Sequence, residues 1–159
     1  MVGQPVAGDA GNGRFHTLLT HALATTATGG DRIGALVAHA EARPLLAGVA
    51  DLIDVPASNM RRLAHAAPAA LRDWGAQAAV FSYIAPLQRR CPSIVVVHDV
   101  LFRMRPEWFS LRVRGLLGTL VPLSIRRAAA VVTVSQTSKA DLVSAFGIDP
   151  DRVQVISNV

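Results

Sequence analysis

The segment Ser93-Ile94-Val95-Val96-Val97-His98-Asp99-Val100 gives the clearest indication of how this chain folds. Its four consecutive β-branched residues give the segment two apolar faces, which is typical of a strand buried on both sides in a helix-covered parallel sheet. The run stops at the polar pair His98-Asp99, and in open α/β sheets ligands bind at the carboxyl ends of the strands. Two interpretations of the pair follow. It forms a ligand site, or Asp99 caps a turn beside a histidine with a structural role.

Length and composition indicate one domain with an aliphatic core. The chain has 159 residues, of which 51% are hydrophobic and only 5% aromatic. This balance favours a helix-covered sheet over a β-sandwich. The formal net charge of +5 comes from 15 arginines and the single lysine Lys139 against 11 acidic residues. Arginine in place of lysine and abundant alanine indicate a GC-rich bacterial genome, and the basic balance suits phosphate groups or an anionic membrane surface.

Cysteine usage and the N-terminus bear on the cellular compartment. Cys91 is the one cysteine, so no internal disulfide forms and a reducing cytosol is expected. Residues 1–5 carry neither the basic n-region nor the apolar h-region of a signal peptide. The uncharged apolar run Gly115–Ile125 has 11 residues, too few to span a bilayer. We expect a cytoplasmic protein that is soluble or lies on the inner face of the cell membrane.

Helical and strand patterns alternate along the chain. Residues 1–10 show no periodicity and are expected to be irregular. Apolar spacing predicts helices and strands in the following order: helix 15–24, strand 33–38, a helical turn or two in 40–49, strand 50–56, helix 60–74, strand 78–81, strand 93–97, helix 110–129, strand 130–134, helix 139–146 and strand 153–156. Strands joined by helical crossovers form a parallel, Rossmann-like sheet, so the predicted class is α/β.

Two short segments have both an anion-binding and a purely structural interpretation. Gly11-Asn12-Gly13-Arg14 opens a helix, where backbone N–H groups can approach a phosphate, but it is equally a flexible turn. Ser135-Gln136-Thr137-Ser138 lies between a strand and a helix, and its hydroxyls suit an anion or simple capping.

Arginines mark two surfaces. Those of the helix predicted over 60–74, among them Arg61 and Arg62, are assigned to its solvated face. Residues 101–109 are predicted to form a long loop that carries the aromatics Phe102 and Trp108 and two arginines, of a kind that is often functional. The helix after it carries four arginines and no acid between them: Arg112, Arg114, Arg126 and Arg127. They form the wet face of a core-packed helix, or a surface that touches lipid or acceptor phosphate.

Five segments in fixed order carry a family resemblance. They are Val95-Val96-Val97-His98-Asp99, Arg105-Pro106-Glu107-Trp108-Phe109-Ser110, Arg126-Arg127-Ala128, Val132 to Leu142, and Asp151 to Asn158. This combination resembles the N-terminal domain of family 4-like glycosyltransferases, which are retaining enzymes of GT-B architecture. The similarity spans about residues 11–158, and Gly11-Asn12-Gly13 takes the place of the family's Gly-rich loop.

The resemblance implies an activity and its partners. Such an enzyme transfers a hexose, for example mannose or glucose, from a nucleotide sugar to a glycan or glycolipid. The N-terminal domain mainly binds the acceptor. The nucleotide sugar is a co-substrate held mainly by the C-terminal domain, and no other cofactor is implied. Contact with a membrane surface fits a glycolipid acceptor, and no nucleic acid is implied.

The resemblance also implies roles for single residues. His98 and Asp99 are the candidate catalytic residues. His98 touches the transferred sugar or the acceptor, and Asp99 orients His98 or the following loop. The candidate substrate-binding residues are Gly11 and Gly13, which approach phosphates or acceptor; Arg14 and Arg105, which contact anionic acceptor groups; and Ser135, which faces the same cleft.

Two departures from the family pattern shape the domain assignment. The family has a hydrophobic strand before its Gly-rich loop, whereas Val2 and Val6 lie among Gly, Pro and Asp, so the sheet lacks its first strand or the start of the chain is misassigned. Residues 11–159 are assigned to the N-terminal domain, and the sequence stops before a C-terminal domain. Transfer needs stabilisation of a departing diphosphate and contact between donor and acceptor, so we expect the isolated chain to be inactive.

Other functional classes remain as alternatives. The first is a stand-alone module that binds a glycolipid or pairs with a separately encoded C-terminal domain. A nicotinamide-dependent oxidoreductase is disfavoured because Gly11-x-Gly13-x-x-His16 lacks the third glycine, and Glu41 follows Gly13 by roughly 28 residues rather than about 20. Nucleic-acid binding would rest on the arginine excess alone. The scattered histidines predict no metal site.

Overall fold

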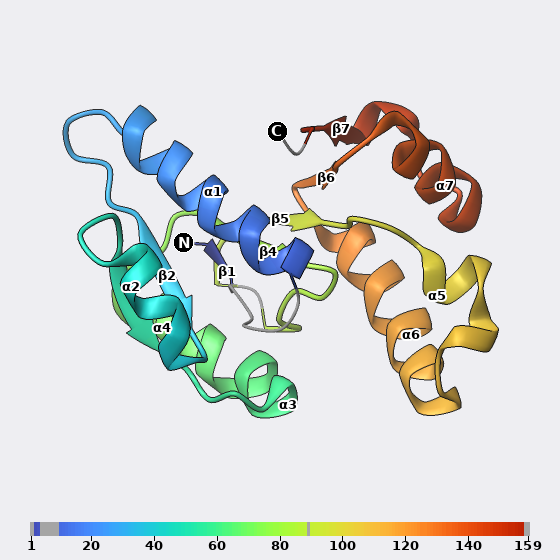
Figure 1. Ribbon diagram of the computed structural model, residues 1–159, viewed down its shortest axis with the longest axis horizontal. Coiled ribbons are helices and arrows are strands. Elements are labelled where there is room, and N and C mark those ends of the chain that lie inside the picture. The colour runs from blue at the N-terminus through green and yellow to red at the C-terminus, as the bar shows by residue number, and fades with distance from the viewer. Residues whose placement is uncertain (1, 4–9, 89, 158–159) are drawn as a thin grey trace. The chain divides into compact units, whose positions relative to one another are not determined.

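A computed structural model describes residues 2–3, 10–88 and 90–157, with side chains from residue 13 onward in these ranges (Figure 1). The chain divides into two units. The first comprises residues 1–80 and 86–92, and the second comprises residues 81–85 and 93–159. Both units combine parallel strands with helices, which confirms the predicted α/β class with a Rossmann-like parallel sheet.

The first unit contains a parallel sheet with the strand order β3-β2-β1-β4. Its strands are β1 (Val2–Gly3), β2 (Gly34–Val37), β3 (Asp51–Asp54) and β4 (Ala79–Ser82), the last of which ends in the second unit. Strand β2 lies between β1 and β3, with Ala35 opposite both Val2 and Leu52. All four residues of β2 are buried, as expected for a strand with neighbours on both sides.

The helices of the first unit pack around this sheet. They are α1 (Ala10–Thr26), the 3₁₀ turn η1 (Ala40–Ala42), α2 (Arg43–Leu46), α3 (Asn59–Arg61), the π-helical segment η2 (Arg62–Ala66) and α4 (Ala67–Trp74). Helix α1 contacts β1 and α2. The indole of Trp74 lies on Gly34 so closely that a Cβ there would meet two ring carbons at 3.0 Å, so a side chain at this position of β2 would have to displace the indole.

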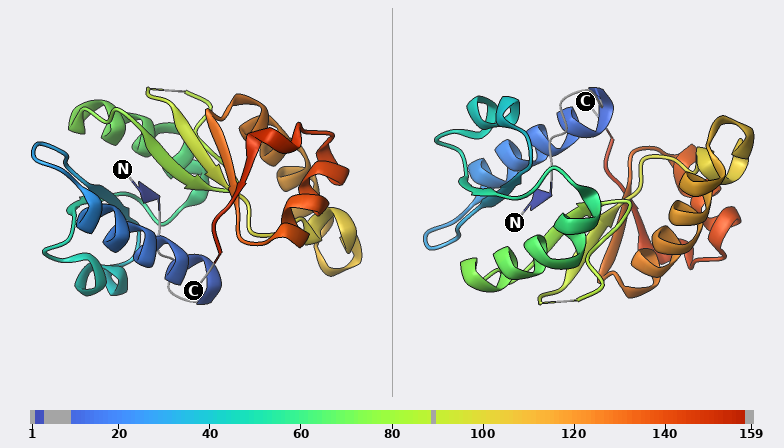
Figure 2. Two further views of the ribbon diagram at one scale, coloured as in Figure 1. Left: turned by 90° about the horizontal axis from the view of Figure 1, so that it is seen from above. Right: turned by 90° about the horizontal axis from the view of Figure 1, so that it is seen from below.

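The second unit contains a parallel sheet with the order β5-β6-β7. Its strands are β5 (Ser93–Val96), β6 (Ala130–Thr133) and β7 (Val153–Val155), and Figure 2 shows β5 and β6 side by side. Val95 pairs with Val131, and both are fully buried. The apolar run within residues 93–100 therefore forms a strand buried on both sides, as predicted.

The helices of the second unit connect and cover these strands. They are α5 (Leu101–Met104), the 3₁₀ turn η3 (Pro106–Trp108), α6 (Leu111–Arg127), α7 (Gln136–Phe146) and the 3₁₀ turn η4 (Pro150–Arg152). Helix α6 packs on β5, and α7 packs on β6 and β7 (Figure 1). Ser110 caps α6 by accepting the N–H of Val113, and Gly147 ends α7 at φ +61°, a conformation that favours glycine.

The structure corrects two expectations for the N-terminus. Val2 and Gly3 form strand β1, where residues 1–10 were expected to be irregular, with the first strand missing or the start of the chain misassigned; residues 4–9 lie outside the described residues. A two-residue strand has no local pattern, because its hydrogen bonds come from the neighbouring strands. Gly11 and Gly13 belong to the first turn of α1 rather than to a turn before it.

Two further expectations are corrected along the chain. Residues 101–109 form α5 and η3 instead of a long loop. Arg62, assigned to a solvated face, is 7% exposed, because its guanidinium donates to the carbonyl oxygens of Pro56 and Ala57 at 3.2 and 3.0 Å and to Asn59 Oδ1. In the described part of the chain, no helix combines the length and apolar character needed to cross a membrane.

Candidate functional site

The polar pair His98-Asp99 lies at the carboxyl edge of the second unit's sheet. Val97 donates its N–H to Val132 O at 2.8 Å, and its own carbonyl accepts the hydroxyl proton of the fully buried Thr133 at 2.7 Å. These two bonds hold the segment after β5 against β6. His98 follows directly after this anchor and Ser135 follows Thr133 by two residues, so both leave the sheet at its carboxyl edge.

Tyr83 reaches the same edge from the end of β4. Its N–H donates to Val96 O at 2.8 Å, and a three-residue turn around it is closed by the N–H of Ile84 on Ser82 O at 2.6 Å. Tyr83 has φ +58°, the one positive φ at a non-glycine position among the described residues. Such backbone is uncommon away from glycine and concentrates at functional sites, where the surrounding structure holds it in place.

Three side chains meet here and form what we term the Tyr83–His98–Asp99 cluster. The Tyr83 hydroxyl donates to Asp99 Oδ2 at 2.9 Å, and the centroids of the Tyr83 and His98 rings lie 6.0 Å apart at a tilt of 41°. Asp99 Oδ1 accepts the N–H of Leu101 at 3.0 Å, which starts α5. All three cluster residues are half-buried, so the cluster is ordered by the fold while part of it stays accessible.

The geometry gives the cluster residues different chemical capacities. Each carboxylate oxygen of Asp99 accepts one hydrogen bond, so Asp99 orients Tyr83 and the start of α5 and is a positioning residue. The imidazole of His98 can donate or accept at its two nitrogens. Together an imidazole and a phenol at a sheet edge suit a ligand that is rich in hydroxyl groups.

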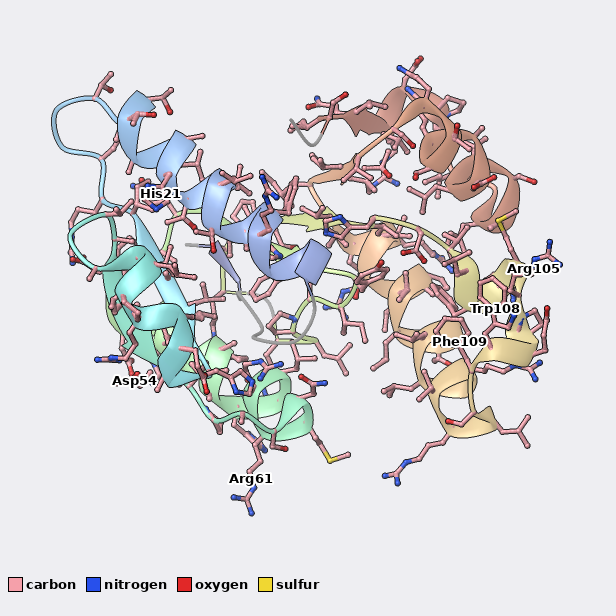
Figure 3. All side chains as sticks on the ribbon, viewed as in Figure 1. His21, Asp54, Arg61, Arg105, Trp108 and Phe109 are labelled. Carbon is pink, nitrogen blue, oxygen red and sulfur yellow. The ribbon has the colours of Figure 1, made fainter. Side chains whose placement is uncertain are left out.

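The other candidate residues of the second unit lie at two places. Ser135 Oγ accepts the N–H of Ser138 and contacts its hydroxyl, both at 3.0 Å, so this side chain caps α7. Arg105 is exposed between α5 and η3, close to Trp108 (Figure 3). The capping alternative thus accounts for the position of Ser135, whereas Arg105 is open to an external anion.

The candidate residues of the first unit lie at the start of α1. Gly11 and Gly13 are in its first turn, where backbone N–H groups have no acceptor within the helix, and Arg14 follows them, exposed. The hydroxyl of Thr17 donates to Gly13 O at 3.0 Å. The structure places Gly11, Gly13 and Arg14 together at the start of α1 in the first unit.

Sequence reasoning missed Tyr83. The signal was present, because Ser82 and Tyr83 are polar residues at the end of an apolar strand, the same feature that singled out His98 and Asp99. No group of three or more His, Cys, Asp or Glu side chains suited to a metal ion occurs within the ranges that the structure describes.

Comparison with known proteins assigns the chain to a family. The sequence profile of Glycosyltransferase Family 4 matches residues 23–159, which is most of the chain and includes the whole Tyr83–His98–Asp99 cluster. No curated protein matches the chain. The resemblance found in the sequence is confirmed by this match and by the α/β fold with its parallel strands. The chain belongs to glycosyltransferase family 4, and its fold is consistent with an N-terminal, Rossmann-like domain of a GT-B glycosyltransferase.

Proposed function

We propose that this chain forms the acceptor side of an enzyme that transfers a hexose, such as mannose or glucose, from a nucleotide sugar to a glycan or glycolipid. One observation carries the proposal: a chain of glycosyltransferase family 4 presents the Tyr83–His98–Asp99 cluster at the carboxyl edge of parallel strands. Ligands of open α/β sheets bind at this edge. The part-exposed cluster offers hydrogen-bonding groups that match sugar hydroxyls.

Under this proposal, His98 and Asp99 have different roles. His98 hydrogen-bonds a hydroxyl of the acceptor or of the transferred sugar. Asp99 acts through its bonds to Tyr83 and Leu101, which fix the surroundings of His98. In the second unit, we assign Arg105 to anionic acceptor groups and Ser135 to contact with the substrate. In the first unit, we assign Arg14 to anionic acceptor groups and the backbone N–H groups of Gly11 and Gly13 to phosphates or acceptor.

The leaving diphosphate sets the requirement for a second domain. Its departure needs preorganised positive charge and donors aimed at the developing negative charge. We assign that task mainly to a nucleotide-sugar-binding domain, with the nucleotide sugar as co-substrate and no further cofactor. The 159-residue chain by itself should then release no measurable sugar from radiolabelled GDP-mannose or UDP-glucose, and clear turnover would contradict this assignment.

Acceptor binding is tested directly on the 159-residue chain. We expect hexyl glucoside or hexyl mannoside, titrated into ¹⁵N-labelled protein below micelle formation, to shift the amide resonances of Tyr83, His98 and Asp99. A hexyl ether of tetraethylene glycol is the control for the alkyl chain. Shifts confined to other regions, or an equal response to the control, would overturn the acceptor-side assignment.

His98→Ala separates binding from folding. The variant is expected to weaken hexyl glycoside binding at least tenfold, while the free energy of unfolding changes by less than about 1 kcal/mol, since the side chain is half-buried and lies at a strand end. Parallel loss of binding and stability would identify His98 as a structural residue. His98→Gln, which retains a donor and an acceptor, is the matched variant and should keep part of the affinity.

A further inference from the structure

Helices α5 and α6 expose apolar side chains that the second unit does not cover. The large exposed residues are Leu101 (38%), Met104 (54%), Trp108 (66%), Leu111 (80%), Val113 (40%) and Leu116 (50%). Helix α5 packs against both η3 and α6, so these residues belong to neighbouring elements of one unit. With the arginines Arg103, Arg105, Arg112 and Arg114 they make up what we call the apolar–arginine face. Figure 3 shows Arg105 and Trp108 at this end of the unit.

Core packing does not explain the apolar residues of this face. All six residues 111–116 are exposed, although side chains in the first two turns of a helix point in every direction around its axis. Farther along the same helix, Val121 and Ile125 are buried at 0 and 1%. The C-terminal half of α6 thus packs on the sheet, and the N-terminal half projects from it with three large apolar side chains.

The charge of this region is concentrated and largely unpaired. Residues 101–127 contain six arginines and one acid, Glu107, which gives a net charge of +5, the same as the formal charge of the whole chain. In the described part of the chain, Arg105, Arg112 and Arg114 have no acidic side chain within 4 Å. Arg103 lies over the ring of Phe146 at 5.9 Å. The four arginines at positions 103, 105, 112 and 114 therefore form no ion pair with the residues that the structure describes.

We infer that the apolar–arginine face docks on an anionic phospholipid surface. Trp108, Leu111 and Leu116 enter the boundary between headgroups and acyl chains, and the arginines meet lipid phosphates. A fluid bilayer accepts apolar side chains that project all round a helix end, whereas a protein partner would have to be shaped to them. The excess of one charge sign selects anionic lipid. This inference stands without the proposed sugar transfer, because the face is built from residues outside the cluster.

Vesicle binding tests the inference on the 159-residue chain. We expect sedimentation with vesicles of equal parts phosphatidylcholine and phosphatidylglycerol, weak binding to phosphatidylcholine alone, and release by salt. Since each basic residue near an anionic surface strengthens binding about fivefold, Arg112→Gln with Arg114→Gln should weaken it roughly 25-fold. Leu111→Ser with Leu116→Ser should weaken it at least tenfold, because the apolar contribution scales with buried area.

A matched pair in the first unit provides the control. Met60 is 74% exposed and Arg61 is exposed beside it, so Met60→Ser with Arg61→Gln removes a similar apolar and basic surface elsewhere (Figure 3). This control should bind vesicles like the unchanged chain. All these substitutions are at exposed positions, and far-ultraviolet circular dichroism checks that each variant folds.

Tryptophan fluorescence locates the contact. The chain has two tryptophans, and Trp74→Phe leaves Trp108 as the reporter. Its emission should shift to the blue on anionic vesicles and be quenched by lipids brominated on the acyl chain. Three results would overturn the inference: no binding to anionic vesicles, equal weakening by the control pair, or a change in oligomeric state of the face variants without lipid, which would make the face a protein interface. Retained glycoside shifts at His98 in those variants distinguish such a failure from failure of the proposed function.

Discussion

The arginines of the two units differ in what they contact. In the first unit, Arg32 pairs with Asp51 and Arg43 with Asp54, both at 2.6 Å, and Arg72 with Asp73 at 2.8 Å. On the apolar–arginine face of the second unit, Arg105, Arg112 and Arg114 have no such partner within the described ranges.

Because of this difference, the net positive charge of the chain is concentrated in one region of the second unit. Exposed ion pairs contribute little to stability, so the pairs of the first unit chiefly cancel charge, two of them at β3 and the third on α4. The unpaired arginines give the second unit a region of positive potential, and exposed apolar side chains lie beside it. A net charge of +5 is thus a local property of residues 101–127 rather than a general basic character.

We expect the largest change in the free energy of unfolding from a substitution in the C-terminal half of α6, and almost none from one in its N-terminal half. Ile125→Ala should lower the free energy of unfolding by about 2–5 kcal/mol, because Ile125 is 1% exposed and its loss leaves a cavity. Leu116→Ala, at a position 50% exposed, should change it by less than about 0.5 kcal/mol. Urea unfolding measures both. A similar loss from both substitutions would show that the N-terminal half of α6 is covered in solution.

Arg62 is neither exposed nor ion-paired with any residue that the structure describes, and we expect its substitution to give the next largest change in the free energy of unfolding. Arg62→Ala should cost about 1–3 kcal/mol, because it leaves the carbonyls of Pro56 and Ala57 without their buried donor. Burial also lowers the pKa of the Arg62 guanidinium. The neighbouring Arg61→Ala removes an exposed arginine and should stay within about 0.5 kcal/mol in the same urea measurement. Equal values would mean that Arg62 is solvated.

Asp99 of the second unit accepts hydrogen bonds from a hydroxyl and a backbone N–H, whereas Asp51 and Asp54 of the first unit pair with arginines. Asp99→Ala should cost about 1–2 kcal/mol, since it removes the acceptor for the Tyr83 hydroxyl and for the N–H of Leu101 at the start of α5. Asp99→Asn keeps an acceptor and should cost less. Thermal unfolding at low and high salt checks both, and a strong salt dependence would reveal an ionic partner that the described residues do not provide.

The smallest effect concerns acid titration of the first unit. The pKa of Asp51 lies below its ordinary value of 3.8 because Arg32 and then Trp74 donate hydrogen bonds to its carboxylate. A lowered folded-state pKa adds stability that is complete above the ordinary value and disappears as the pH falls through the folded value. Urea midpoints from pH 6 to pH 2 should therefore fall less steeply in Asp51→Asn. An unchanged slope would show that the pair is broken in solution.

The sequence predicted the parts of the fold that carry their own periodicity. The β-branched run ending at Val97 is a buried strand, and Ser110 caps a helix that continues through Pro122. Strand β1 was missed because a two-residue strand exists only through its neighbours. Arg62 was misplaced because its buried position depends on carbonyls in the turn before the helix, and helical periodicity does not encode that contact.

The candidate site divides in the same way. The position of His98 and Asp99 after a buried strand follows from the local pattern. Their contact with Tyr83 depends on which residues of β4 and β5 lie together, and on a turn with φ +58° that no glycine announces. The capping role of Ser135 was foreseen as an alternative because Ser138 follows at the spacing of a helix cap.

The π-helical segment between α3 and α4 has a consequence for chain length. Ala67 donates its N–H to Arg62 O, five residues back instead of the four of an α-helix, so this turn holds one residue more than a regular one. Deleting a single residue from 63–66 would restore a regular turn and leave the packing of α4 in phase. The same deletion in the middle of α6 would rotate every later side chain by about 100° and turn Ile125 away from its sheet. Single-residue deletions among related sequences should therefore be tolerated at residues 63–66 and excluded from the middle of α6.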